Sequence, residues 1–314
     1  MSARRDAKLV LAILATALLL LLTASPALAL ARLLPADNIW NTPVVNLPVH
    51  ARSAAYVDSI GAGKSMHPDF GAGLWRGRPI GIPWNEVGAG QPKVNISFYY
   101  PDASDPGPYP IPPDAAVEGG SDRHILLVDH ATNKLYEVFD AQKNADGSWS
   151  AGSGAVWDLG SNALRPAGWT SADAAGLPML PGLVRYEEVA SGRIDHALRF
   201  TAPRTAKAFV WPARHQASNS GDPNLPPMGQ RFRLKAGFDT SGFAASVRVV
   251  LEALKEYGMM LSDNGGPWYI SGAPDSRWND DVLVSQLRRV PGSAFEAVDV
   301  SSLMVNPDSG QARR

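Results

Sequence analysis

Prolines and glycines interrupt this chain at short intervals, and that spacing constrains its fold more than any other feature. The 314 residues include 26 Pro and 29 Gly, and most segments between them have the length of a strand rather than of a helix. We therefore predict a mainly β protein, an antiparallel sandwich or jelly roll with one long and one short helix near the C-terminus. The alternative is an α+β chain divided near residue 240.

The N-terminus has the pattern of a secretory signal peptide. Basic side chains at positions 4, 5 and 8 precede an uncharged apolar run over 9–22, and Ala27, Leu28 and Ala29 supply a small-residue cleavage site. The run is shorter than the roughly 20 residues that a membrane-spanning helix needs. We expect a signal peptide over 1–29, a secreted protein and no stable membrane insertion after cleavage, with an uncleaved anchor as the alternative.

The net charge and the residue composition limit the classes of partner that the protein is expected to bind. Without residues 1–29 the chain keeps 26 basic and 29 acidic side chains, a net charge of −3, which argues against nucleic acid and anionic membranes. The chain has no Cys, so disulfides, a Cys nucleophile and thiolate metal sites are excluded. Its six His show no compact metal-ligand spacing. We expect no metal and no cofactor, and a polysaccharide or cell-wall glycan as partner.

The spacing of Pro and Gly also predicts how the chain is divided into regions. We expect a loop-rich N-terminal arm or lid over 30–122, the β-sandwich core with its helices over 123–302, and a tail over 303–314. The clearest helix has apolar residues three and four positions apart over 241–257, and a shorter one follows over 280–289. Predicted strands cover 125–128, 135–140, 149–159, 183–189, 194–201, 207–211, 232–236, 268–271 and 295–300.

Glu137 is the first candidate for chemistry. Alternation along its strand places it on the same face as Leu135 and Phe139, and a buried carboxylate must be paired, protonated or lining a cleft. Many β-sandwich glycosidases hold two carboxylates facing a groove, an analogy at the level of the fold only. We take Glu137 and Asp158 as the catalytic pair, with Asp129, Glu187 and Glu188 as other choices for the second carboxylate.

His196 and Arg185 indicate a different chemistry. His196 shares a strand face with Leu198 and Phe200, which fits either a hydrogen-bonded core histidine or a catalytic one. An Arg that neutralises a sugar carboxylate beside a His that removes a proton would make a polysaccharide lyase. The plainer interpretation of Arg185 is a surface pair with Glu187 on one strand.

Aromatic residues complete the predicted groove. Most of the nine Trp stand beside Gly, Pro or polar residues, so several are expected at the surface, where an aromatic face stacks on a sugar ring. As substrate-binding residues we predict Trp157, Trp211, Tyr136 and His215.

Several segments resemble an uncharacterised family of exported bacterial proteins. The similarity covers about residues 120–300 and rests on the segments 180–188, 192–198, 212–215, 225–229, 253–259 and 263–265. It implies a bacterial exported protein and assigns no reaction. The residues themselves favour an extracellular carbohydrate-active enzyme, a hydrolase or a lyase. The alternatives are a non-catalytic glycan or cell-wall binding protein and a structural envelope protein.

Overall fold

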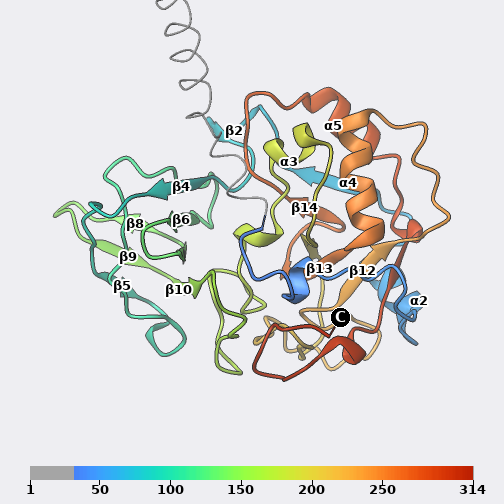
Figure 1. Cartoon of the computed structure of the whole chain (residues 1–314), viewed down its shortest axis with the longest axis horizontal. Helices are drawn as coiled ribbons and strands as arrows, with labels where there is room; N and C mark the ends of the chain where they lie inside the picture. The colour runs from blue at the N-terminus through green and yellow to red at the C-terminus, as the bar shows by residue number, and fades with distance from the viewer. Residues whose placement is uncertain (1–31, 314) are drawn as a thin grey trace, which may run out of the picture. The chain divides into compact units, whose positions relative to one another are not determined.

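The computed structural model describes residues 32–313, which belong to one compact unit (Figure 1). The predicted signal peptide lies outside the described residues. Strands outnumber helices and form four sheets, so the prediction of a β-rich protein is confirmed. Among residues 32–313, no helix has the length and apolar character to cross a membrane.

The largest sheet has six strands. Its strand order is β1 (His67–Asp69), β14 (Tyr269–Ser271), β11 (Leu198–Ala202), β13 (Met259–Asn264), β12 (Arg231–Leu234) and β15 (Phe295–Ala297). Four aromatic rings form its core, with Trp268 stacked between Phe200 and Phe295 and edge-on to Phe232. Such packing buries large apolar areas, and in a chain without disulfides it is the main source of stability.

A second group of strands forms around another core. One sheet has the order β10 (Ser153–Asp158), β7 (Lys134–Phe139), β6 (Ile125–Asp129) and β4 (Trp84–Val87), and a three-stranded sheet has the order β5 (Ile96–Phe98), β9 (Trp149–Ala151) and β8 (Gln142–Lys143). Residues of both sheets contribute to one hydrophobic cluster, in which Tyr109 and Ile125 are fully buried. The hairpin β2 (Leu74–Trp75) and β3 (Arg78–Pro79) forms the remaining sheet.

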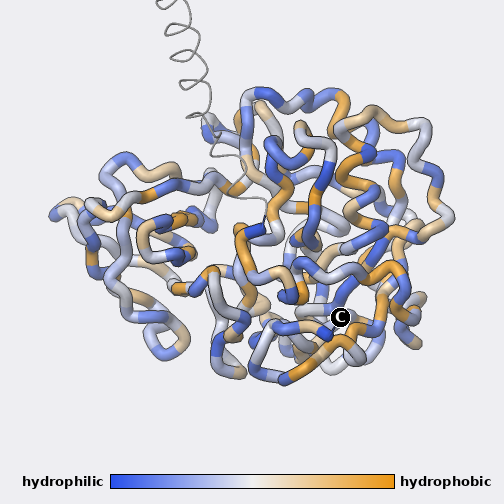
Figure 2. Tube along the Cα trace, viewed as in Figure 1, coloured by the Kyte–Doolittle hydropathy of each residue, from blue (hydrophilic) through white to orange (hydrophobic). Residues whose placement is uncertain are grey.

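The helices are short apart from one. Within residues 32–313 they are α2 (Ser53–Ile60), α3 (Tyr186–Ser191), α4 (Ala245–Glu256) and α5 (Asp280–Leu287), with 3₁₀ turns η2 (Ile39–Asn41), η3 (Pro101–Ala103), η4 (Leu180–Gly182), η5 (Gly292–Ala294) and η6 (Ser301–Leu303). Helix α4 buries Val247, Val250 and Leu254 on one face, and Figure 2 shows this alternation as orange and paler or blue segments. Asn279 caps α5 by accepting the N–H of Val282.

The segment 30–122, predicted as a loop-rich arm, supplies strands to the sheets from residue 67 onward. Strand β1 pairs with β14, β4 with β6 and β5 with β9, each in parallel. Parallel neighbours need long connections, and these strands reach their partners from far along the chain. The sheets are therefore mixed, where the sequence predicted antiparallel pairing only.

Three predicted strands differ from what the structure shows. The segment 183–189 was expected as a strand, but α3 begins at Tyr186, directly after an extended Arg185, and the left-handed Gly192 ends it. Glu187 and Glu188 in its first turn favour the helix N-terminus. In the segment 194–201 the strand begins only at Leu198, so His196 lies before it and the predicted alternation does not apply. Residues 207–211 contribute a single bridge between Phe209 and Met228.

Candidate functional site

The candidate site is a cavity of about 410 Å³ where several parts of the chain meet. Its walls come from the start of η3, the end of β7, the start of β10, the loop 170–174, the loop around 215 and the end of β13. The lining includes Tyr100, Phe139, Ser153, Thr170, Ser171, Asp173, His215 and Asp263. Aromatic faces, hydroxyls and ionisable groups thus surround a space in the size range of small-molecule sites.

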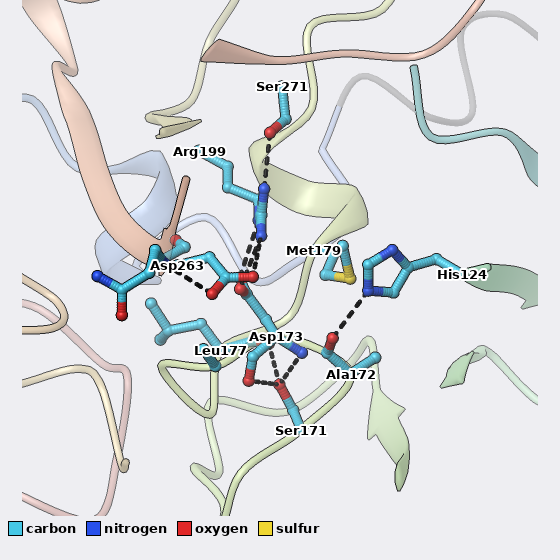
Figure 3. A network of polar contacts seen from close by, with 12 residues as sticks. His124, Ser171, Ala172, Asp173, Leu177, Met179, Arg199, Asp263 and Ser271 are labelled. Carbon is cyan, nitrogen blue, oxygen red and sulfur yellow. Dashed lines mark hydrogen bonds and ion pairs between the residues drawn. The ribbon is translucent and has the colours of Figure 1, made fainter. Parts of the chain in front are cut away.

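Arg199 organises the polar side of this cavity (Figure 3). Its Nε and Nη2 donate to the two carboxylate oxygens of Asp173 at 3.0 and 2.9 Å. Nη1 donates to Ser271 Oγ at 2.7 Å, and Nη2 also reaches Asp263 Oδ2 at 3.3 Å. One buried guanidinium therefore holds two carboxylates beside one another, in the planar fork geometry that suits Arg.

A β-bulge brings Asp263 to this side. The parallel register of β11 and β13 pairs Phe200 with Leu261 and then Thr201 with Asp263, which leaves Ser262 as the extra residue. Paired residues of a sheet share a face, and Arg199 and Thr201 are two positions apart on theirs. Without the extra residue, Asp263 would point to the opposite face, so the bulge re-aims its side chain into the cavity.

The environment of Asp263 favours its protonated form. Burial raises the pKa of its carboxyl to about 6 against the opposing charge of Arg199, and the neighbouring Asp173 contributes to the rise. Its side chain keeps 29% of its surface exposed, so it remains accessible from the cavity. Asp173 is completely enclosed. Burial raises its pKa too, but Arg199 opposes that change, and its oxygens are occupied by the guanidinium.

His215 is the imidazole that lines the cavity. Its Nδ1 lies 2.8 Å from the carbonyl oxygen of Ala174. A carbonyl only accepts, so Nδ1 is the donor in this contact and Nε2 makes no part of it. The cavity thus has a carboxyl and an imidazole among its lining groups.

A buried histidine connects the cavity with the segment before β6. His124 Nδ1 makes a short contact with the Glu118 carboxylate, and its Nε2 donates to Ala172 O at 3.0 Å. Burial disfavours the imidazolium, but the Glu118 charge outweighs it and raises the pKa of His124. Because the carbonyl of Ala172 immediately precedes Asp173, this contact fixes the loop that carries the second carboxylate.

The structure encloses Glu137 in the protein core. Its exposed fraction is 0%, and its carboxylate accepts the backbone N–H groups of Met179 and Leu180 at 2.9 Å and the indole N–H of Trp157 at 3.0 Å. Burial raises its pKa to about 7. Both faces of β7 are buried, so alternation could not separate a cleft from the core. Glu137 and Trp157 together tie β7 and β10 to η4, without access to substrate.

Arg185 and His196 form a second enclosed cluster, centred on Glu188. Arg185 Nη2 donates to Glu188 Oε1 at 2.5 Å, and His196 Nε2 lies 3.1 Å from the same oxygen. His196 is 3% exposed, and its Nδ1 is 2.8 Å from Ala197 O. This arrangement fits the core interpretation of His196, and Arg185 pairs with Glu188 rather than Glu187.

The other predicted site residues are scattered. Asp158 is exposed at the end of β10 and accepts the N–H of Gly160. Tyr136 is buried, with its hydroxyl accepting from Lys93 Nζ at 3.0 Å. Trp211 is half-buried, and its indole donates to Ser309 O. Of the eight predicted residues, His215 alone lines the cavity.

Sequence reasoning missed Asp173 and Asp263. Asp263 follows the apolar run of β13, so the sequence indicates an acidic residue at the end of that strand. No sequence pattern predicts the bulge that turns its side chain toward the cavity. Among residues 32–313, no group of three His, Asp or Glu is placed to hold a metal ion.

Comparisons of the chain with protein families, with characterised proteins and with solved structures gave no match. The resemblance to exported bacterial proteins therefore stays a prediction.

Proposed function

We propose that the protein is an extracellular carbohydrate-active enzyme that cleaves a glycan in the cavity beside Asp263. The observation that carries this proposal is the partly exposed Asp263 carboxyl, whose pKa lies near 6 and which shares a cavity with the His215 imidazole. Pairs of groups whose environments suit opposite proton transfers are typical of hydrolytic sites. Export rests on the predicted signal peptide.

The proposed reaction is hydrolysis. Asp263 gives its proton to the departing glycosidic oxygen as the bond from that oxygen to the anomeric carbon breaks. His215 Nε2 takes a proton from the water whose oxygen forms the new bond to that carbon. Arg199 positions Asp263, and Asp173 offsets the guanidinium charge so that Asp263 keeps its proton at mildly acidic pH. Removal of a sugar proton by His215 would instead give a lyase.

Tyr100 supports a sugar as substrate. It lines the cavity with 50% of its surface exposed, and Tyr99 stands edge-on to it with ring centroids 4.7 Å apart. Exposed rings stack on the apolar face of a sugar while nearby hydroxyls bind its polar edge. The same feature favours the second candidate, a glycan-binding protein without catalysis. The sandwich or jelly-roll scaffold stays a prediction, on which this proposal does not depend.

The test is a panel of neutral and acidic polysaccharides, with reducing ends and the absorbance of unsaturated uronates as readouts. We expect reducing ends from the wild type and a loss of about 100-fold or more in Asp263→Asn and His215→Gln. Asp114→Asn is the control, because Asp114 is exposed and outside the cavity. Full activity of Asp263→Asn would contradict the proposal. Binding that needs Tyr100, without cleavage of any polysaccharide, would favour the non-catalytic candidate.

A further inference from the structure

A second cavity of about 360 Å³ lies between the β2–β3 hairpin, the segment before β6, and strands β8 and β9. Three cationic side chains line it, from Arg78, Arg123 and Lys143, against the single carboxylate of Glu118. We propose that this cavity is a binding subsite for a sugar that carries a carboxylate or a sulfate. That the ligand is an anion follows from the cationic lining of the cavity. That it is a sugar rests on the proposed function, and the proposal names the class of sugar.

Two of the three cations have no counter-ion among residues 32–313. Glu118 is engaged by His124, and Arg123 pairs with Asp140. Within residues 32–313, no carboxylate lies within ion-pair distance of Arg78 or Lys143, and neither side chain has a hydrogen-bond partner. A guanidinium and an ammonium therefore face one cavity with their donors free. Both groups bind carboxylate and sulfate oxygens through charge-assisted hydrogen bonds.

Both side chains are exposed and line the cavity. The backbone at Gly119 lies so close to Arg78 that a Cβ there would stand 2.7 Å from Arg78 Cβ. The absence of a side chain at residue 119 therefore lets the aliphatic part of Arg78 pack against the backbone at that residue. Lys143 pairs with Trp149 across the antiparallel strands β8 and β9. Directly paired residues share a face of the sheet, which places the Lys143 ammonium on the side of the buried Trp149 ring.

An exposed aromatic ring beside the cavity indicates a sugar rather than a small inorganic anion. Trp75 pairs with Arg78 in the β2–β3 hairpin, so the two side chains share one face. Trp75 leaves 61% of its surface exposed, where an indole offers a flat area for a pyranose ring. A uronate or sulfated sugar stacked on Trp75 would have its charge within reach of Arg78.

The experiment measures binding by calorimetry in low salt with three oligosaccharides of matched length. These are an oligogalacturonate, its fully methyl-esterified form, which has the same sugars without the charge, and a sulfated galactan oligosaccharide. The proteins are the wild type, Arg78→Ala/Lys143→Ala, and the control Lys207→Ala/Arg288→Ala, which removes the same charges from exposed positions outside the cavity. Lys143→Glu is a second variant, and the melting temperature checks the folding of each protein.

We expect one or both charged oligosaccharides to bind the wild type and the control, and to bind the double variant about tenfold or more weakly. Whether the carboxylate or the sulfate form binds distinguishes the two sources of charge. Binding should weaken with salt, and Lys143→Glu and Trp75→Ala should each reduce it. The proposal is overturned if the methyl ester binds as well as the acid, if the double variant binds like the control, or if neither charged oligosaccharide binds.

The experiments distinguish a failure of the proposed function from a failure of the proposed subsite. Asp263→Asn, which removes the proposed acid, leaves both cations of the second cavity in place and should keep the oligosaccharide affinity of the wild type. If Asp263→Asn abolishes cleavage while the double variant binds and cleaves normally, the subsite is wrong and the proposed function stands. If the double variant loses binding while Asp263→Asn cleaves normally, the catalytic assignment is wrong and the anionic subsite stands.

Discussion

The indole nitrogen of Trp157 donates a hydrogen bond to the Glu137 carboxylate at 3.0 Å, inside the protein. The same carboxylate accepts the backbone N–H groups of Met179 and Leu180, next to η4. One enclosed side chain thus joins two strands of a sheet to a turn more than 40 residues away in the chain. Its contribution is to stability, since no substrate reaches it.

Glu137→Gln should therefore destabilise the fold. The Gln amide nitrogen cannot accept a hydrogen bond, so it leaves at least one buried N–H without a partner, at a cost of about 3 kcal/mol. Urea unfolding at pH 5 measures the change, and Asp158→Asn at the exposed end of β10 should change the free energy of unfolding by less than about 0.5 kcal/mol. Equal stability of the two variants at this pH would contradict this role for Glu137.

The stability difference between the wild type and Glu137→Gln should depend on pH. Burial raises the pKa of Glu137 from 4.5 to about 7, so the folded state binds the proton more tightly than the unfolded state. Its contribution is fully present below pH 4.5 and is lost as the pH rises through about 7. We expect the advantage of the wild type to shrink by up to roughly 3 kcal/mol over this range. A constant difference from pH 4 to pH 8 would show that the pKa is not raised.

The Arg185, Glu188 and His196 cluster gives the opposite pH dependence. Burial disfavours the Glu188 carboxylate, but His196 and Arg185 outweigh it and hold its pKa below the usual value. Glu188→Gln removes the buried carboxylate that pairs with Arg185 and contacts His196, and should cost about 4 kcal/mol above pH 5, a loss that diminishes as the pH falls. Glu187→Gln is the matched control, because its exposed ion pair with Arg277 contributes about 1 kcal/mol or less. Similar unfolding midpoints for the two variants would exclude the cluster as a stabilising element.

The sequence predicted what depends on local pattern and missed what depends on long-range pairing. Apolar runs located β6 and β7, and three- and four-residue periodicity located α4. Alternation failed at Glu137 because a strand buried on both faces has no solvent side. It failed at His196 because the strand begins two residues later. Asp263 was missed because its direction depends on a bulge opposite β11, and a bulge is a property of the pair of strands.

Asp173→Asn should move the pH dependence of activity. The negative charge of Asp173 helps to raise the pKa of Asp263, and its removal also frees Arg199 to interact more strongly with Asp263. Both effects lower the pKa of the proposed acid.

In the wild type, kcat/KM should fall as the pH rises above about 6, where Asp263 loses its proton, and in Asp173→Asn this fall should occur at lower pH. The variant also loses about 3 to 5 kcal/mol of stability because the buried Arg199 loses its bidentate carboxylate partner, so the rates are measured where circular dichroism shows a folded protein. Asp114→Asn should keep the wild-type profile. A profile of Asp173→Asn that is reduced in height but unmoved along the pH axis would mean that Asp173 acts on folding alone and does not tune Asp263.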